Sequence, residues 1–237
     1  MKQPFFSIVI PTKDRPELLR NAILSVLLQD SDDYELIVSD NFSDERTKKV
    51  VDEFQDNHYL TYIRTDKELN MPDHWEFATK IAKGKYVLVL TNRSFLRQGA
   101  LQDIYDSISG SKQDVKVCFW NHGHYDEKNK ILFGEKEQVG TKFLKSTYLI
   151  RKFIQTLDAD LLPKPCYGCY NREFAQNIRQ KIGRLYLSVN PDYTSALLFL
   201  AYSDSIMYLP RTLFFLQGDR VGNTFEHYMR SFDASDI

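Results

Sequence analysis

A run of five apolar residues at 86–90 (YVLVL) is bounded by polar or charged residues on both sides. Continuous apolar runs of this length predict a strand covered on both faces, as in the centre of a parallel sheet. The run ends at the polar turn 91–94 (TNRS), and a helix is predicted over 98–109. Ligands of open α/β sheets bind beyond the carboxyl ends of such strands. The turn is therefore expected at a binding site, with an ordinary strand-to-helix loop as the simpler alternative.

Strands and helices alternate along the first half of the chain. Apolar and β-branched runs predict strands at 5–10, 34–38, 60–64 and 86–90. Apolar residues at helical spacing predict intervening helices from Pro16 to before Asp30, over 45–54 and over 75–82. Polar turns follow the first, second and fourth strands. This order predicts a parallel sheet with right-handed crossovers and a nucleotide-sized crevice along one edge.

The pattern changes near residue 113. Strands are predicted at 115–120 and 206–215, a turn-rich excursion at 121–129 with a hairpin strand at 131–133, a stiff loop at 162–169, and helices over 145–157, 172–181 and 191–202. We expect a single α/β domain over 1–237, with a mostly parallel half (1–113) and a smaller, mixed half (114–237).

Composition excludes several classes of protein. The formal net charge is -1, so no basic excess is present to drive nucleic-acid binding. Three cysteines are too few for a disulfide framework, and the odd number favours a reducing compartment. No apolar run is long enough for a signal peptide or a membrane span. We therefore expect a cytoplasmic protein with at most peripheral membrane contact, for example at the inner face of the membrane.

Several segments in order resemble the inverting glycosyltransferases of family 2, which have the GT-A fold. The matching segments are a first strand ending in Pro11-Thr12, Ser39-Asp40-Asn41-Phe42-Ser43 after the second strand, the Asn70 segment, Ala82-Lys83-Gly84-Lys85-Tyr86-Val87, Phe95-Leu96-Arg97-Gln98-Gly99-Ala100-Leu101, and Pro191-Asp192. The resemblance covers residues 5–110 well and 160–225 loosely. Each motif is weak alone, whereas their common order and spacing are fairly specific.

The resemblance implies a site for a nucleotide diphosphate-sugar. Its donor-binding residues are expected to be Thr12, Asp14, Asp40, Asn70 and Asn92, with Asp40 accepting a hydrogen bond from the base ring imide. Asp192 is expected to be the general base that deprotonates an acceptor hydroxyl, because inversion needs a base on the face opposite the leaving nucleotide. An N-cap role for Asp192 and a plain turn role for Asp40 are the alternatives.

The chain departs from the family at its Asp-rich metal motif, where it has the turn 91–94 instead. The family's Mg²⁺ or Mn²⁺ is doubtful here, since Asn92 lacks a charge and Arg93 repels a divalent cation. In one interpretation the Arg93 guanidinium replaces the metal and neutralises the departing diphosphate. In the other, the domain binds a nucleotide or a partner without catalysis. The first is favoured because Thr12, Asp40 and Asp192 remain.

Other candidate residues carry less weight. Cys166 and Cys169 could form a redox pair or half a zinc site, and His122 and His124 a metal site or a wall on the acceptor side. Trp120 is the aromatic residue expected to face the acceptor. His227 occupies a position where some GT-A enzymes have a late metal ligand. No phosphate-binding lysine loop, dinucleotide glycine motif or hydrolase nucleophile elbow is present in the sequence.

The sequence thus predicts sugar transfer from a nucleotide diphosphate-sugar to a hydroxyl of a glycan or a lipid-linked acceptor, with inversion and without a certain metal cofactor. The competing class is a non-catalytic GT-A-like domain that binds a nucleotide or a partner.

Overall fold

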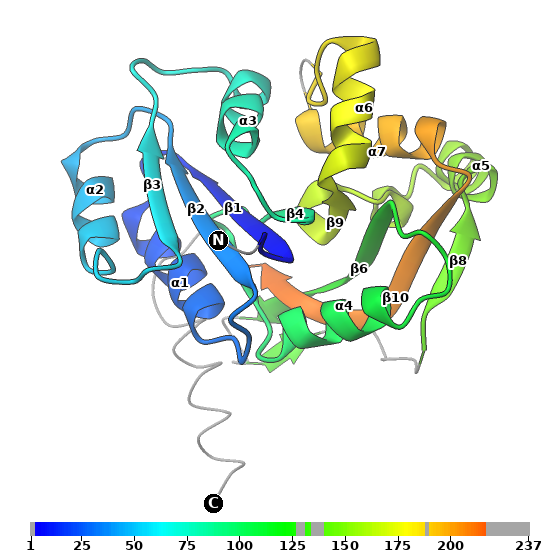
Figure 1. The fold of residues 1–237 in the computed structure, drawn as a ribbon, viewed down its shortest axis with the longest axis horizontal. Coiled ribbons are helices and arrows are strands. Elements are labelled where there is room, and N and C mark those ends of the chain that lie inside the picture. Colours follow the sequence, from blue (N-terminus) through cyan, green and yellow to red (C-terminus); the bar gives the residue numbers. More distant parts are fainter. Residues whose placement is uncertain (1–2, 127–130, 134–139, 188–189, 217–237) are drawn as a thin grey trace, which may run out of the picture.

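The computed structural model describes residues 3–126, 131–133, 140–187 and 190–216. Ten strands form one sheet whose main path has the order β3-β2-β1-β4-β9-β6-β10-β5, with β7 paired to β6 and β8 to β10 (Figure 1). Helices flank the sheet. This architecture confirms the predicted α/β fold with a Rossmann-like first half.

The first half is parallel and follows the predicted alternation. Its strands are β1 (Phe6–Thr12), β2 (Tyr34–Asp40), β3 (Leu60–Arg64) and β4 (Tyr86–Val89). Its helices are α1 (Pro16–Leu27), α2 (Glu45–Asp52), α3 (Met71–Lys80) and α4 (Ala100–Ser109). β1 is buried along its whole length and pairs in parallel with both β2 and β4. Because parallel strands point the same way, the turns after β1, β2 and β4 meet at one edge of the sheet.

The second half is mixed, as predicted. Its strands are β6 (Val117–Asp126), β7 (Ile131–Phe133), β8 (Lys142–Lys145), β9 (Gly168–Asn171) and β10 (Ser205–Leu216). β5 (Ser94–Leu96) belongs to the first half of the chain but pairs antiparallel with β10. Its helices are α5 (Ser146–Thr156), α6 (Arg172–Ile182) and α7 (Pro191–Tyr202), with short 3-10 turns η1 (Ala159–Leu161) and η2 (Pro165–Tyr167). Helices α5 to α7 lie on one side of this half in Figure 1.

The prediction of a turn-rich excursion at 121–129 is wrong over 121–126. β6 continues to Asp126 because β10 pairs with it in parallel as far as His124, and β7 pairs with it antiparallel. The hairpin partner at 131–133 is confirmed. Strands β5, β8 and β9 are short and were not predicted, since three or four residues carry too little periodicity. Residues 127–129 lie outside the described ranges.

β9 joins the two halves of the sheet. It lies between β4 and β6 and is antiparallel to both, with Cys169 opposite Leu88 on one side and Cys118 on the other. An antiparallel strand enters the sheet at the edge where its neighbour leaves it. The loop 164–167, which precedes β9, is therefore brought next to the turn 91–94, which follows β4.

Two apolar layers cover the faces of the sheet. One contains Ile8, Ile10 and the buried face of α1; the other contains Val9, Val89 and the apolar face of α7. Gly84 precedes β4 where the chain crosses β1, and a Cβ there would lie 2.5 Å from the backbone nitrogen of Ser7. This close approach requires glycine at position 84, immediately before β4 pairs with β1.

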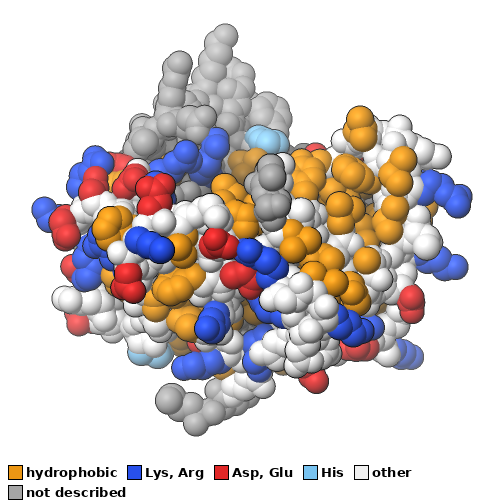
Figure 2. Space-filling model, turned by 90° about the horizontal axis from the view of Figure 1, so that it is seen from above, with side chains coloured by type: hydrophobic (Ala, Val, Ile, Leu, Met, Phe, Trp, Pro, Cys, Tyr) orange, Lys and Arg blue, Asp and Glu red, His pale blue; other side chains and the backbone are white. Residues whose placement is uncertain are grey.

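Hydrophobic side chains gather on the half of the surface shown in Figure 2 where α5, α6 and α7 lie, whereas acidic and basic side chains alternate on the half with α2. Large apolar side chains exposed on these three helices are Tyr148, Ile154, Ile182 and Leu197. None of the helices in the described ranges is both long and apolar enough to cross a bilayer.

Candidate functional site

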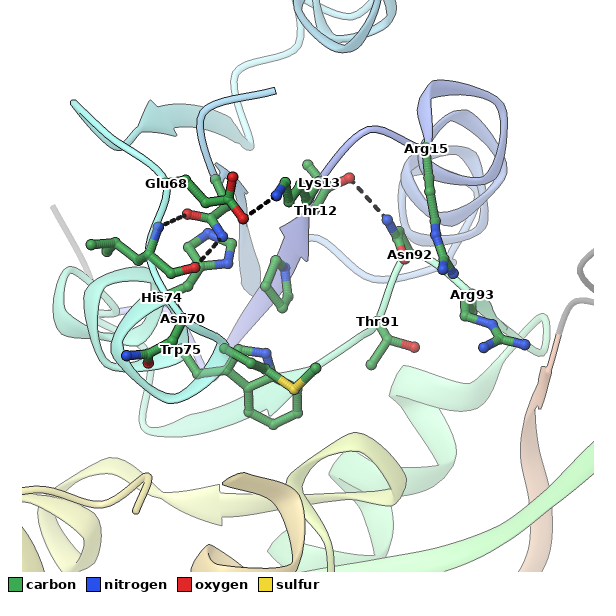
Figure 3. A pocket seen from close by; sticks show the side chains of 14 residues that line it. Thr12, Lys13, Arg15, Glu68, Asn70, His74, Trp75, Thr91, Asn92 and Arg93 are labelled. Atoms are coloured by element: carbon green, nitrogen blue, oxygen red, sulfur yellow. Dashed lines mark hydrogen bonds and ion pairs between the residues drawn. The ribbon is translucent and has the colours of Figure 1, made fainter. Parts of the chain in front are cut away.

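A pocket of about 570 Å³ opens at the edge of the sheet where the polar turns meet (Figure 3). Segments from the ends of β1, β2 and β4 and from the start of α3 line it. The lining residues are Pro11, Thr12, Lys13, Arg15, Asn41, Glu68, Leu69, Asn70, Met71, His74, Trp75, Thr91, Asn92 and Arg93. This volume lies within the range of about 300–1,000 Å³ that is usual for small-molecule sites.

Three of the lining residues are cations. Arg15 and Arg93 are exposed and lie on the same side of the pocket in Figure 3, and Lys13 forms an ion pair with Glu68. Glu68 is the one acidic residue of the lining. The excess of positive charge favours an anionic ligand, because charges of one sign that line a cleft concentrate counter-ions of the other sign.

The turn 91–94 is held at both ends. β4 ends before it, β5 begins at Ser94, and the hydroxyls of Thr91 and Ser94 lie 3.0 Å apart. Within it, the buried Asn92 donates a hydrogen bond from Nδ2 to Oγ1 of Thr12 at 3.0 Å. The structure thus brings the predicted residues Thr12 and Asn92 together, with Arg93 next to them on the pocket wall.

The donor set at this turn does not fit a divalent cation. Hard cations such as Mg²⁺ take charged carboxylate oxygens, whereas this turn offers a neutral amide and a guanidinium. Across the part of the chain that the structure describes, no three His, Cys, Asp or Glu side chains are grouped so that they could hold a metal ion. The possible late ligand His227 lies outside the described residues.

Asp40 lies outside the pocket lining. Its carboxylate is fully buried, accepting hydrogen bonds from the backbone N–H of Ser43 at 2.9 Å and the hydroxyl of Tyr62 at 2.7 Å. The guanidinium of Arg64 lies 3.8 Å away. Burial and the hydrogen bond to Asp40 raise the pKa of Tyr62, so this phenol stays a donor. In this structure the carboxylate therefore holds the turn 40–43 together.

Asn41, the next residue, lines the pocket instead. Its Nδ2 donates to the carbonyl of Leu69 at 2.8 Å, and its Oδ1 accepts from the N–H of the same residue at 2.8 Å. This pair of bonds ties the segment before α3 to the end of β2. Sequence reasoning chose the acidic residue of this turn, although Asn is equally suited to bonding a neighbouring backbone.

Asp14 also lies outside the pocket lining. It is exposed and has a positive φ of 50°. Its Oδ1 accepts from the N–H of Asp44 at 3.2 Å, and its own N–H donates to Oγ of Ser43 at 3.0 Å. These bonds join the turn after β1 to the turn after β2.

The start of α3 forms one wall of the pocket. Asn70 caps the helix by accepting from the N–H of Asp73 at 3.0 Å. His74 and Trp75, which sequence reasoning did not assign to the site, are buried in the same wall. Burial lowers the pKa of His74 to about 4, and its Nε2 lies 3.0 Å from Oγ of Ser39. The imidazole is therefore neutral near pH 7.

Asp192 lies in the first turn of α7 and is half-buried, outside the pocket lining. The N-cap of α7 is Asn190, so Asp192 is not the capping residue. The Asp192 carboxylate acts on the neighbouring loop 164–167: it contributes, after burial, to raising the pKa of Cys166 to about 12. Asp192 therefore lies near the loop that adjoins the turn 91–94.

The structure corrects the expectation for Trp120 and argues against a redox pair of Cys166 and Cys169, which are both free thiols. Trp120, expected to face the acceptor, is 2% exposed and packs in the core. Cys118 and Cys169 face each other across β6 and β9 as buried free thiols, and burial raises the pKa of Cys118. His122 stacks on Tyr167, with ring centroids 4.3 Å apart.

Comparison with known proteins gives the family. The family model for "Glycosyl transferase family 2" matches residues 7–159. The beta-1,3-glucosyltransferase for GalNAc(5)-diNAcBac-PP-undecaprenol of Campylobacter jejuni is 34% identical over 103 residues, which are 43% of this chain and 33% of that protein. The glycosyltransferase GlyG of Streptococcus pneumoniae is 21% identical over 125 residues, 52% of this chain and 40% of that protein. The chain thus spans less than half the length of these curated relatives.

Solved structures share the fold. TarS 1–349 of S. aureus in complex with UDP-GlcNAc aligns with a TM-score of 0.68 at 16% identity, covering 97% of this chain and 65% of TarS 1–349. The mannosyltransferase PcManGT of Pyrobaculum calidifontis, in complex with GDP-Man and Mn²⁺, aligns with a TM-score of 0.59 at 13% identity, covering 90% and 56%. The GT-A-like fold is confirmed, and because the family model spans more than half of the chain, the chain belongs to glycosyl transferase family 2.

Proposed function

We propose that this chain transfers a sugar from a nucleotide diphosphate-sugar to a hydroxyl acceptor, with inversion and without a metal ion. The observation that carries the proposal is the position of Arg93, which lines the pocket beside Asn92 where the family has its acidic motif. A guanidinium can make two parallel hydrogen bonds to a phosphate and neutralise its charge. Arg15 and Lys13 line the same pocket and add to this charge.

In the proposed reaction, Asp192 accepts the proton of the acceptor hydroxyl. The acceptor oxygen forms a bond to the anomeric carbon of the sugar, from the face opposite the nucleotide. The bond from that carbon to the diphosphate oxygen breaks, and its electron pair leaves with the diphosphate. Arg93 and Arg15 stabilise the charge that develops there, which is the role of preorganised cations in a transition state.

The remaining predicted residues support the donor. Thr12 and Asn92 hold each other in the pocket wall, and Asn70 fixes the start of α3. Asp40 and Asp14 are proposed to hold the turn 40–44 in the shape that presents Asn41 to the pocket, since their carboxylates bond the backbone of that turn. We propose that Asp40 affects binding of the nucleotide base through this turn, because its carboxylate is buried and bonded to Ser43 and Tyr62.

The acceptor is proposed to be a glycan or a lipid-linked acceptor. The name of the C. jejuni relative includes a PP-undecaprenol group. In this chain, the exposed Ile154 and Tyr148 lie on α5 next to the cations Arg151 and Lys152. Apolar and basic side chains on one helix suit peripheral contact with an anionic membrane surface. We therefore propose that the protein works in the cytoplasm, at the inner face of the membrane.

A non-catalytic binding domain is the second candidate, and the replaced metal motif favours it. The two functions differ in what Asp192→Asn changes. An enzyme loses turnover with this substitution but keeps its affinity for the nucleotide, whereas a binding domain shows no turnover before or after the change.

The first test is calorimetric binding of UDP, GDP and their sugars to the purified chain, with Mn²⁺ and with EDTA. Binding that persists in EDTA and weakens about tenfold or more in Arg93→Ala supports the proposal, as expected for loss of a charge-assisted contact. Arg20→Ala is the control, because Arg20 pairs with Glu53 on the surface, away from the pocket. Binding that needs Mn²⁺ contradicts the role of Arg93, and no binding of any nucleotide contradicts the donor pocket itself.

A further inference from the structure

Lys164 is a buried cation whose surroundings are aromatic. Only 5% of the residue is exposed, and its ammonium lies 4.7 Å from the centroid of the Tyr167 ring and 4.9 Å from that of Tyr193. Among the described residues, no carboxylate lies within ion-pair distance of it. Among the Asp, Glu, Lys and Arg residues that the structure describes, Asp40 is the other buried one, and its charge is met by Tyr62, Ser43 and Arg64.

The aromatic contacts offset only part of the cost of burying this charge. Burying an ion costs more than a cation–π contact returns, and no ion pair among the described residues makes up the difference. A methionine or leucine would fill the same space without that cost. A lysine at this position is therefore suited to a ligand that brings a negative charge.

The register of the sheet places Lys164 beside the donor pocket. Because β9 is antiparallel to β4, the loop 164–167 adjoins the turn 91–94 that carries Arg93. Tyr193, whose ring faces the ammonium, follows Asp192 on α7. Lys164 therefore lies close to α7, the helix that carries the proposed base, and its loop adjoins the donor turn.

The aromatic rings of the same cluster stack on one another beneath the ammonium of Lys164. His122 stacks on Tyr167 with the rings 11° from parallel, and Tyr167 stacks on Phe214 with centroids 5.2 Å apart. Burial lowers the pKa of His122 below its ordinary value, with the Asp160 carboxylate opposing this shift and His124 and Lys164 adding to it, so the imidazole is neutral near pH 7. Lys164 is then the positive charge that the cluster presents.

We propose that Lys164, with Tyr167 and Tyr193, binds an anionic group of the acceptor, a phosphate or a carboxylate, and so holds the acceptor hydroxyl near Asp192. This inference rests on the proposed function and narrows it to negatively charged acceptors. A phosphate belongs to a phosphorylated or pyrophosphate-linked acceptor, and a carboxylate to an acidic sugar.

The experiment uses the full chain saturated with UDP, so that the donor pocket is occupied. Glycerol 1-phosphate and glucuronic acid are titrated separately, and the backbone amide resonances of Tyr167 and Tyr193 are followed by NMR. We expect one of the two probes to cause saturable chemical-shift changes. The probe that does so identifies the anion as a phosphate or a carboxylate. In Lys164→Met the affinity for that probe falls about tenfold or more, while UDP binds as before.

Thermal unfolding separates this role from a structural one. Lys164→Met is expected to keep or raise the Tm, because an apolar side chain replaces an unpaired buried charge. Lys116→Met is the matched control, since its ammonium lies over the single ring of Phe174 at 5.7 Å, outside the cluster. A lower Tm for Lys164→Met with unchanged probe binding overturns the inference, as does UDP-saturated protein that binds neither probe. If UDP does not bind, GDP is used in its place, and failure of both nucleotides to bind contradicts the proposed function instead.

Discussion

Asn92 donates a hydrogen bond to Thr12 in the wall of the pocket, at 3.0 Å between Nδ2 and Oγ1, and both residues are buried. The bond joins the end of β1 to the turn after β4, two segments 80 residues apart in the chain. The turn that carries Arg93 is thereby held against the first strand of the sheet.

Removing the acceptor of this bond is expected to destabilise the protein. Thr12→Val leaves a buried amide donor without its Thr12 partner, which costs about 1–3 kcal/mol, whereas Thr12→Ser keeps the hydroxyl. Denaturant unfolding measures the difference. Thr61→Val on the exposed side of β3 is the control and is expected to be neutral or slightly stabilising. Equal stability of Thr12→Val and wild type contradicts the assigned bond.

His74 should make stability depend on pH. Its folded pKa of about 4 lies below the ordinary value of 6.5, because burial disfavours the charged ring. Between these values the unfolded chain binds more protons, so stability is fully present above pH 6.5 and is lost as the pH falls toward 4. The loss is on the order of 3 kcal/mol, at about 1.4 kcal/mol per pKa unit.

The measurement is the free energy of unfolding at pH 7 and at pH 4 for wild type and for His74→Gln. The variant is expected to lose less stability over this range, and the exposed His58→Gln to lose as much as wild type. If the unfolding free energy of His74→Gln depends on pH as it does in the wild type, His74 is not the source of the pH dependence.

Glu76 links α3, which forms one wall of the pocket, to α6 and to the loop that follows α6. Its carboxylate accepts from the N–H of Tyr186 at 2.7 Å and of Leu185, and from Nε of Arg179 at 2.9 Å. Glu76→Gln replaces an oxygen by an amide group and is expected to cost about 1–3 kcal/mol in unfolding free energy.

The matched control for this link is Glu53→Gln, which breaks the exposed ion pair with Arg20. That pair has side chains 45–50% exposed, so its loss should cost less than about 1 kcal/mol. If Glu76→Gln lowers the unfolding free energy as little as the control does, the hydrogen bonds of Glu76 do not stabilise the fold and the prediction is wrong.

Trp75 should report on nucleotide binding. It is 6% exposed, lines the pocket, and packs edge-on against Tyr186 with centroids 5.4 Å apart. Trp120, the second tryptophan, is in the core and away from the pocket lining. We expect UDP to change the tryptophan fluorescence of the wild type and of Trp120→Phe, but not that of Trp75→Phe. A response that persists in Trp75→Phe places the nucleotide elsewhere.

The cysteines are expected to be unreactive in the folded protein. Burial raises the pKa of Cys118 and brings that of Cys166 to about 12, and Cys169 is 1% exposed. A thiol reagent at pH 8 should label all three only after unfolding, because the thiolate is the reactive species. Rapid labelling of Cys166 and Cys169 in the native protein would contradict this prediction and support a redox pair.

The alternation of strands and helices was predictable from the sequence because it is encoded locally. Apolar runs and the proline at the start of α1 act within a few residues. The polar and basic residues Asn92 and Arg93 of the turn after β4 could also be identified, since this needs only the residue types at one turn. The family resemblance rests on the same local motifs.

The tertiary structure decided which of these residues reach the pocket. Asp40 is turned inward because Tyr62, 22 residues later, and Arg64 meet its charge, and Asn41 takes its place in the lining. β9 is inserted between β4 and β6, which brings Lys164 next to the donor turn. Such placements depend on hydrogen bonds and packing between distant segments, for which a local sequence pattern carries no signal.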